Sequence, residues 1–177
     1  VTDKTTAGLT VVDTIGTTGK KQYAAVSLGD ITVGSAASGA QGNTSFTLTN
    51  QAENAVEASS LTVVKNTNAS TFELDAGKFS VGKLTNQGKV TLTDGEEFTL
   101  TGEGANASGA EITLASSKEY ASLVVAEGAS LQNQGDITGT DNTKGKIKVS
   151  GTLTNLPKIE AVGGNKAVDA GTITAAA

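Results

Sequence analysis

The sequence predicts an all-β fold, and within that class a parallel β-solenoid, in which the chain winds through similar coils stacked on one another. Two features support this prediction. Short segments of apolar–polar–apolar form follow one another along most of the 177 residues, at the spacing of roughly 8 to 12 residues that is typical of β proteins. In addition, a short motif recurs in the second half of the chain, which is typical of folds built from repeating layers.

The expected strands alternate apolar and polar side chains, so that one face is buried and the other presents Thr, Lys or Glu to solvent. Val, Ile and Thr are frequent in these segments, and their branched side chains suit a pleated sheet. The expected strands lie at residues 9–12, 31–33, 46–48, 61–63, 72–74, 79–81, 90–92, 98–100, 112–114, 147–149 and 173–174.

Two segments also carry helical signals. Asn50 and Glu53 have the spacing of a capping box, and the Ala-rich residues 50–60 form the body of one possible helix. Residues 116–119 spell a second capping box and are followed by apolar residues at helical spacing. A strand at residues 121–125 is the alternative for this second segment.

The repeated motif consists of a β-prone residue, a polar turn centred on Asn and a second β-prone residue. Its three copies occupy residues 84–90, 131–137 and 153–159. The second and third copies are 22 residues apart, and the first and second are 47 apart, which is about two such steps. We therefore predict that every coil turns at the same corner and that the asparagines stack there as a hydrogen-bonded ladder. These asparagines are Asn86, Asn133 and Asn155.

An antiparallel β-sandwich, or a jelly-roll of the pilin-like kind completed by strand exchange, is the alternative fold, because short strands separated by turns suit it as well. No linker or charge run divides the chain, so residues 1–177 are expected to form a single β-rich domain. Residues 1–34 are rich in Thr and Gly and alternate only weakly, and we expect them to form a cap, an arm or a donor strand.

The composition limits what the core can contain. Apolar residues make up 37% of the chain and aromatic residues 3%. The interior is therefore expected to consist of Val, Ile, Leu, Ala and Thr, with little room for rings where coils stack in register. With 22 Gly and one Pro, the turns are expected to depend on Gly and Asn.

The missing residue types exclude most kinds of catalysis. The chain has no His, Cys, Met, Trp or Arg, which excludes Ser-His-Asp and Cys-His catalysis, disulfides and zinc–thiolate sites. Asp94, Glu96 and Glu97 are the candidates for a paired-carboxylate glycosidase site, but we interpret this segment as a turn with solvated charge. Residues 136–142 are the one stretch suggestive of calcium, and they lack the acidic density of a calcium loop. We expect no enzymatic activity, no metal and no cofactor.

The net charge of −5 argues against nucleic-acid binding, which requires a basic surface. The Lys-rich residues 144–148 are expected to form a strand with Lys on its solvent face, which discourages further pairing. No run of residues approaches the ~18 apolar residues of a membrane helix, so no membrane insertion is expected. The joint absence of Cys and Met is common in bacterial surface proteins, and a start at Val1 suits a chain whose signal peptide has been removed. We therefore expect a secreted protein located at the cell surface.

Residues 84–92 and 131–139 resemble the Leu-x-Asn-x-Gly-x-Ile-x coils of bacterial autotransporter passengers and filamentous-haemagglutinin-like adhesins. The resemblance covers mainly residues 79–177. It implies a secreted, surface-exposed β-helix that works by adhesion or scaffolding. A separately exported subunit that assembles into a filament suits the length of the chain better than a whole passenger does.

The expected function is that of a secreted structural subunit that builds an extracellular filament, such as a pilus or fimbria, or a surface layer or biofilm. Its partners would be further copies of itself, joined by pairing of open sheet edges. In a sandwich, an assembly strand would be donated to the next subunit. The candidate residues of that strand are Gly8, Leu9, Thr10, Val11 and Val12. The alternative is a monomeric surface adhesin or carbohydrate-binding module whose ligands are host or cell-surface glycans. Glycosylation sequons occur at Asn43, Asn68 and Asn106.

Overall fold

The computed structural model describes residues 6–15, 21–23, 25–35, 44–65, 68–93, 95–115, 121–139, 145–160, 166–170 and 172–174. These residues form strands, turns and bends, and none of them is helical. Accordingly, this part of the chain has no helix that is long and apolar enough to cross a membrane.

The strands differ widely in length, from two residues to sixteen. In chain order they are β1 (Thr6–Val11), β2 (Thr14–Ile15), β3 (Lys21–Gln22), β4 (Val26–Val33), β5 (Ser45–Asn50), β6 (Val56–Val63), β7 (Thr71–Asn86), β8 (Lys89–Leu92), β9 (Gly95–Asn106), β10 (Glu111–Leu114), β11 (Ala121–Val125), β12 (Ser130–Asn133), β13 (Asp136–Gly139), β14 (Gly145–Val149), β15 (Thr152–Asn155), β16 (Pro157–Glu160), β17 (Lys166–Ala170) and β18 (Thr172–Thr174). Every strand expected from apolar–polar alternation lies within one of these, apart from Val12, which follows β1 directly.

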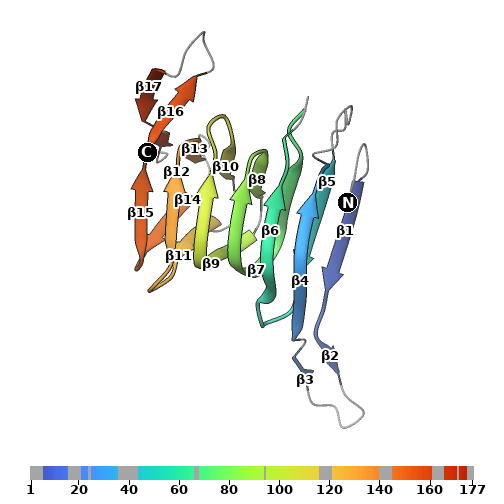
Figure 1. Cartoon of the computed structure of the whole chain (residues 1–177). Helices are drawn as coiled ribbons and strands as arrows, with labels where there is room; N and C mark the ends of the chain where they lie inside the picture. Colours follow the sequence, from blue (N-terminus) through green and yellow to red (C-terminus); the bar gives the residue numbers. More distant parts are fainter. Residues whose placement is uncertain are drawn as a thin grey trace.

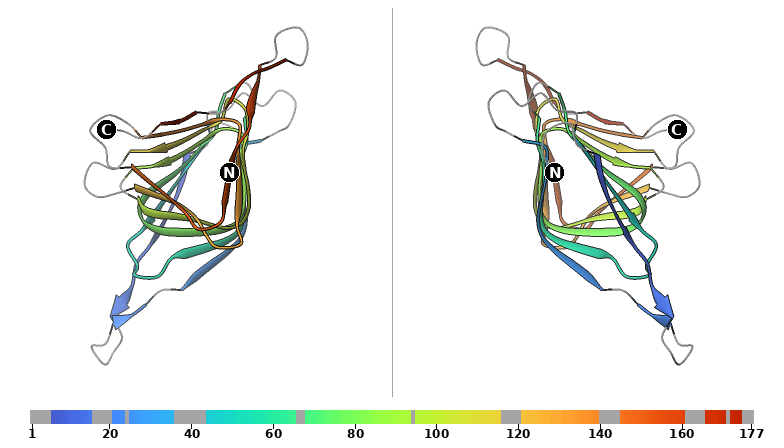
Figure 2. Two further views of the ribbon diagram at one scale, coloured as in Figure 1. Left: turned by 90° about the vertical axis from the view of Figure 1, so that its left-hand side faces the viewer. Right: turned by 90° about the vertical axis from the view of Figure 1, so that its right-hand side faces the viewer.

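Fourteen of the strands form one mostly parallel, nearly closed sheet. Figure 1 shows them side by side in two layers, with β1 and β4 at one end of the row and β15 at the other. Viewed along the row, the ribbon runs round an enclosed interior (Figure 2). The remaining strands form two antiparallel hairpins, β2–β3 and β16–β17.

The two layers correspond to two rows of parallel pairings. In the first row, β1, β5, β7, β8, β10, β13 and β18 pair in that order. In the second row, β4 pairs with β6, β6 with β7 and β7 with β9. Beyond β9, the short strands β11 and β12 form the next level, and β14 and β15 form the last. The long strand β9 covers what β11 and β12 cover in the next level. The longer β7 belongs to both rows, because its first part pairs with β5 and β8 and its second part with β6 and β9.

Side chains that point inward from the second row stack in register, level upon level, because every pairing there is parallel. The result is a set of columns that run the length of the sheet. Three of them are mainly apolar: Val26, Val56, Phe79, Phe98, Leu123 and Ile147; Leu28, Ala58, Val81, Leu100, Val125 and Val149; and Ile31, Leu61, Leu84, Gly104, Leu131 and Leu153. Between the ends, almost all of these side chains are fully buried.

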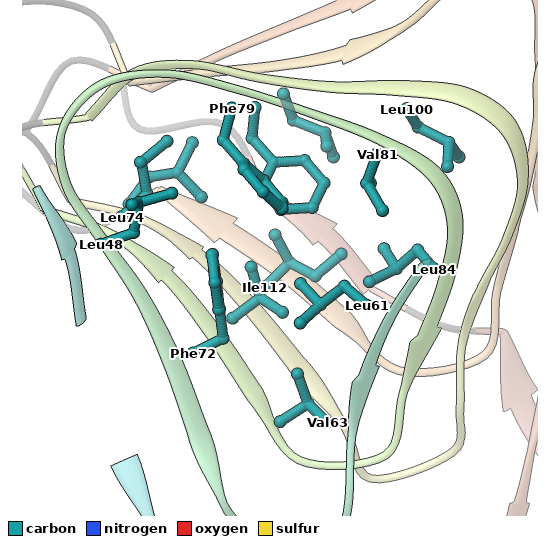
Figure 3. Close-up of a cluster of buried hydrophobic side chains, with 14 of the residues drawn as sticks. Leu48, Leu61, Val63, Phe72, Leu74, Phe79, Val81, Leu84, Leu100 and Ile112 are labelled. Atoms are coloured by element: carbon teal, nitrogen blue, oxygen red, sulfur yellow. The ribbon is translucent and has the colours of Figure 1, made fainter. Parts of the chain in front are cut away.

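The core contains rings, contrary to the expectation that stacked coils leave little room for them. Phe72, Phe79 and Phe98 have no exposed surface, and Phe46 packs on them from β5. The centroids of Phe72 and Phe79 are 5.2 Å apart, and those of Phe79 and Phe98 are 5.4 Å apart, within the range of favourable ring contacts. Figure 3 shows Phe72 and Phe79 among the surrounding Leu, Val and Ile side chains. The rings are accommodated because they come from both layers and meet in the middle of the interior.

Neither helical signal produced a helix in the described residues. Residues 56–63 form β6, with Val56, Leu61 and Val63 buried. The Asn50 side chain starts a bend instead of capping a helix, because its Oδ1 accepts from Ala52 N at 3.0 Å while its Nδ2 donates to Lys78 O at 2.8 Å in the next level. In the second segment, 121–125 is strand β11, and 116–120 lies outside the described residues.

Candidate functional site

The predicted asparagines lie in one column at the corner where the chain passes from the second row to the first. Asn86 Nδ2 donates to Asn106 Oδ1 at 2.7 Å, Asn106 Nδ2 to Asn133 Oδ1 at 2.7 Å, and Asn133 Nδ2 to Asn155 Oδ1 at 2.8 Å. Asn86, Asn106 and Asn133 are fully buried or nearly so, and Asn155 at the end of the column is exposed. All four amides therefore point the same way, and each buried one is bonded to its neighbours.

The ladder is also tied to the backbone of the turns. Asn86 Nδ2 donates to Glu111 O at 2.9 Å, and Asn106 Nδ2 donates to Asp136 O at 3.2 Å. Asn86 Oδ1 accepts from Gly88 N at 3.1 Å. The asparagines thus satisfy backbone groups that a buried turn would otherwise leave unpaired.

The internal repeat of the sequence did not identify Asn106 as a member of the ladder. Its level has Gly104 at the position where Leu84 and Leu131 stand, so the Leu of the motif is absent. The stretch from Asn106 to Ile112 is also two residues longer than the stretch from Asn86 to Val90. One signal was present: Asn106 lies 20 residues after Asn86 and 27 before Asn133, which divides the long 47-residue interval into two steps.

The first end of the sheet is formed by β1 and β4. Gly8, Leu9, Thr10 and Val11 lie in β1, which pairs in parallel with β5 of the same chain from Thr6 to Val11. The candidate assembly strand is therefore an integral end strand rather than a detached arm, and Val12 follows it with 48% of its surface exposed. Among the described strands, β1 pairs only with β5, and β4 only with β6. The outer edges of both strands have no strand beside them in this part of the chain.

The interior opens to the surface between these two end strands. A hollow of about 480 Å³ lies there. Leu9, Leu28 and Ile31 are only partly buried, although each packs against the core. The hollow is lined by Gly8, Leu9, Leu28, Gly29, Ile31 and Phe46, together with the polar Asp30 and Thr32. Apolar side chains that pack on the core thus reach the surface at this end.

The second end is formed by β14, β15 and β18. In the described part of the chain, β14 pairs only with β11, β15 only with β12 and β18 only with β13. Val149, which ends a column that is buried from Ala58 to Val125, is 46% exposed, and Ile147 and Leu153 are partly buried. The structure confirms that Lys146 and Lys148 lie on the exposed face of the Lys-rich strand. Figures 1 and 2 place the β16–β17 hairpin beyond the tips of the strands rather than along the outer edge of β15.

The two ends differ in charge. The one charged side chain in β1 and β4 is the carboxylate of Asp30, which accepts from Ser60 Oγ at 2.7 Å. The charged side chains in β14 and β15 are the ammonium groups of Lys146 and Lys148. The Lys148 ammonium lies 3.1 Å from a Glu97 carboxylate oxygen in an exposed ion pair. One end strand pair is thus acidic and the other basic.

The remaining candidate residues do not come together as a site. Asp94 lies outside the described residues, Glu96 lies in β9, and Glu97 bonds to Lys148. Of the suggested calcium stretch, 136–139 is strand β13 and 140–142 is outside the described residues. Among the side chains that the structure describes, no three Asp or Glu lie close enough together to hold a metal ion.

The sequons fall in different surroundings. Asn43 is outside the described residues, and Asn68 is exposed. The Asn106 amide nitrogen is buried in the ladder and bonded twice, so a glycan would require the ladder to open.

Comparisons with protein-family models, curated proteins and solved structures gave no match.

Proposed function

We propose that the chain is a parallel β-solenoid that serves as a secreted structural subunit and self-assembles through its open sheet ends into an extracellular filament or surface layer. The observation that carries the proposal is that the apolar core runs to both ends and meets unpaired strand edges there, among the described strands.

The solenoid part of the proposal is supported by the register. Each level of the second row is followed along the chain by a level of the first, and the same columns recur from β4 to β15. The Asn column is what a coil produces when it passes one corner repeatedly, since identical side chains then lie one strand spacing apart, about 4.8 Å. An antiparallel sandwich offers no such repetition, and its pairings would be antiparallel.

The assembly part is supported by the edges. An unpaired strand edge is a site for pairing with another chain, and proteins that remain monomeric cover or disrupt it. Here Gly8 to Val11 present the outer edge of β1, and Val149 leaves nearly half its surface in water at the opposite end. The composition favours an extracellular location, because the chain lacks Cys and Met altogether.

A monomeric adhesin or carbohydrate-binding module is the alternative. Carbohydrate sites commonly stack sugar rings on aromatic side chains, and Tyr23 is the one strongly exposed aromatic ring in the described part of the chain. The four Phe residues are committed to the core cluster. We also propose no enzymatic activity, because the chain has no His or Cys and no three of its described Asp and Glu side chains gather in one site.

The proposal is tested by size measurements and electron microscopy on the purified chain. We expect its mass in solution to rise with concentration and filaments or sheets to be visible. Leu28→Lys places a charge in the open end and should leave the chain monomeric, whereas Thr91→Lys, on the outer face at mid-sheet, should assemble normally. A chain that stays monomeric at millimolar concentration and binds a glycan saturably would establish the alternative instead.

A further inference from the structure

The structure assigns the joint between subunits as head to tail and in register: β14 and β15 of one copy add to β4 of the next copy as if the sheet simply continued. This inference rests on the proposed function, since it specifies how the open ends pair.

The register follows from the columns already present. Ile147, Val149 and Leu153 end the three apolar columns on one side, and Val26, Leu28 and Ile31 begin them on the other. Adding one more level at the same stagger continues each column without a break. In this register Ile147 meets Val26, Val149 meets Leu28 and Leu153 meets Ile31 of the next copy. The first row has one level more than the second, so the same shift places β1 of the next copy at the level of β18, and β1 pairs with β13 there in place of β18.

The shapes of the ends agree with this polarity. The β1–β4 end is hollowed by about 480 Å³ and lined by partly buried apolar side chains together with Asp30 and Thr32. The opposite end presents Val149 with 46% of its surface exposed. Apolar side chains from one end thus have a complementary space at the other, and their burial would supply the association with a hydrophobic driving force.

The fourth column is the hardest test of the register, because it brings Asn155 against Val33 of the next copy. Inside the chain, Val63 pairs directly with Asn86 at the opposite end of the ladder, so a Val beside an Asn already occurs at this corner. The order at the joint is reversed, because each Nδ2 donates towards the later strands and the donor end of the ladder therefore meets Val33.

The charges of the end strands favour this head-to-tail joint over joints between two identical ends. A joint between two β4 ends would bring Asp30 near Asp30 of the partner copy, and a joint between two β14 ends would gather four ammonium groups from Lys146 and Lys148. The head-to-tail joint instead places the acidic strand beside the basic one. Surface charges of this kind contribute little affinity but select orientation and partner.

Cysteine cross-linking tests the inference cleanly, because the chain has no cysteine of its own. Ser27 of one copy would lie directly opposite Lys148 of the other. Neighbouring parallel strands are about 4.8 Å apart, within the Cα separation that a disulfide spans. Ser27→Cys and Lys148→Cys are prepared separately, mixed in equal amounts and oxidised mildly. Thr91→Cys on the outer face of β8 is the control for random collisions.

We expect a covalent dimer in the mixture at least tenfold above either variant alone and above the Thr91→Cys control mixed with either. Dimers of Ser27→Cys alone would establish a joint between β4 ends, and dimers of Lys148→Cys alone a joint between β14 ends; either overturns the inference while leaving self-assembly intact. Assembly of the unmodified chain with no cross-link above the control also overturns the register. If the unmodified chain is monomeric by sizing, the proposed function fails as well, so the two failures are distinguishable.

A second pair of variants does not depend on disulfide geometry. Ile31→Lys should block only the β4 end, and Leu153→Lys only the β15 end. Each alone should be monomeric, and their mixture should form a dimer and nothing larger, because one intact end of each kind remains. A mixture that stays monomeric, or either variant dimerising by itself, contradicts a head-to-tail joint.

Discussion

Replacing Asn106, in the buried middle of the ladder, by Ala should destabilise the fold strongly. The substitution deletes the bond from Asn86 Nδ2 at 2.7 Å, the bond to Asn133 Oδ1 at 2.7 Å and the bond to Asp136 O at 3.2 Å. At a net ~1 kcal/mol for each bond, the loss is about 3 kcal/mol. Asn133 Oδ1 is in addition left buried without its donor, which brings the expected loss to about 4 kcal/mol. A domain of ordinary stability has roughly 5 to 15 kcal/mol in total.

The assay is urea unfolding followed by far-UV circular dichroism, at a protein concentration below that of any assembly so that association does not add to stability. Asn155→Ala is the matched control. Asn155 is exposed, and Asn133 Nδ2 keeps its bond to Gly135 O when Asn155 is removed. We expect a loss below about 1 kcal/mol for this control. If Asn106→Ala cost no more than Asn155→Ala, the ladder would not stabilise the fold and the reasoning would be refuted.

Two further pairs of substitutions probe the core and the glycines with positive φ. Phe72→Ala should lower the free energy of unfolding by about 3 to 5 kcal/mol, because it empties the centre of the ring cluster. Phe46 is only partly buried, so Phe46→Ala should cost clearly less. Equal losses in urea unfolding would mean that the rings do not form one packed unit. Gly77 has φ +77°, and a Cβ there would collide with the carbonyl oxygen of Asn50, so Gly77→Ala should cost more than about 2 kcal/mol. Gly128 has φ +78° with open space around it, so Gly128→Ala should cost only about 1 kcal/mol of stability. Similar thermal unfolding midpoints for Gly77→Ala and Gly128→Ala would argue against the steric explanation.

The strands were predictable because alternation directly reflects which side chains face the interior. Val90, Leu92, Ile112 and Leu114, for example, stand at alternate positions and are all buried. The parallel arrangement was harder to predict, since alternation is the same in parallel and antiparallel strands. It was favoured only because the Leu-x-Asn motif recurs at similar intervals, and that recurrence reflects a shared corner.

What could not be predicted depended on contacts between distant parts of the chain. The capping-box spacing at Asn50 is a local signal, but the amide is recruited by Lys78 O, 28 residues away. The Phe cluster likewise forms because β5, β7 and β9 bring rings from neighbouring levels together in the interior. Asn106 escaped detection because Gly104 and a longer turn disguise its level. The outer edges of β1 and β4 could be guessed to lie at an end, but their hollow emerged only from packing.

Fibre diffraction from aligned assemblies tests the central claim most directly. If subunits stack end to end in register, the strands run across the filament and successive levels follow its axis, so a reflection at about 4.8 Å should lie on the meridian. The same reflection on the equator, with the strands running along the filament, would contradict the account.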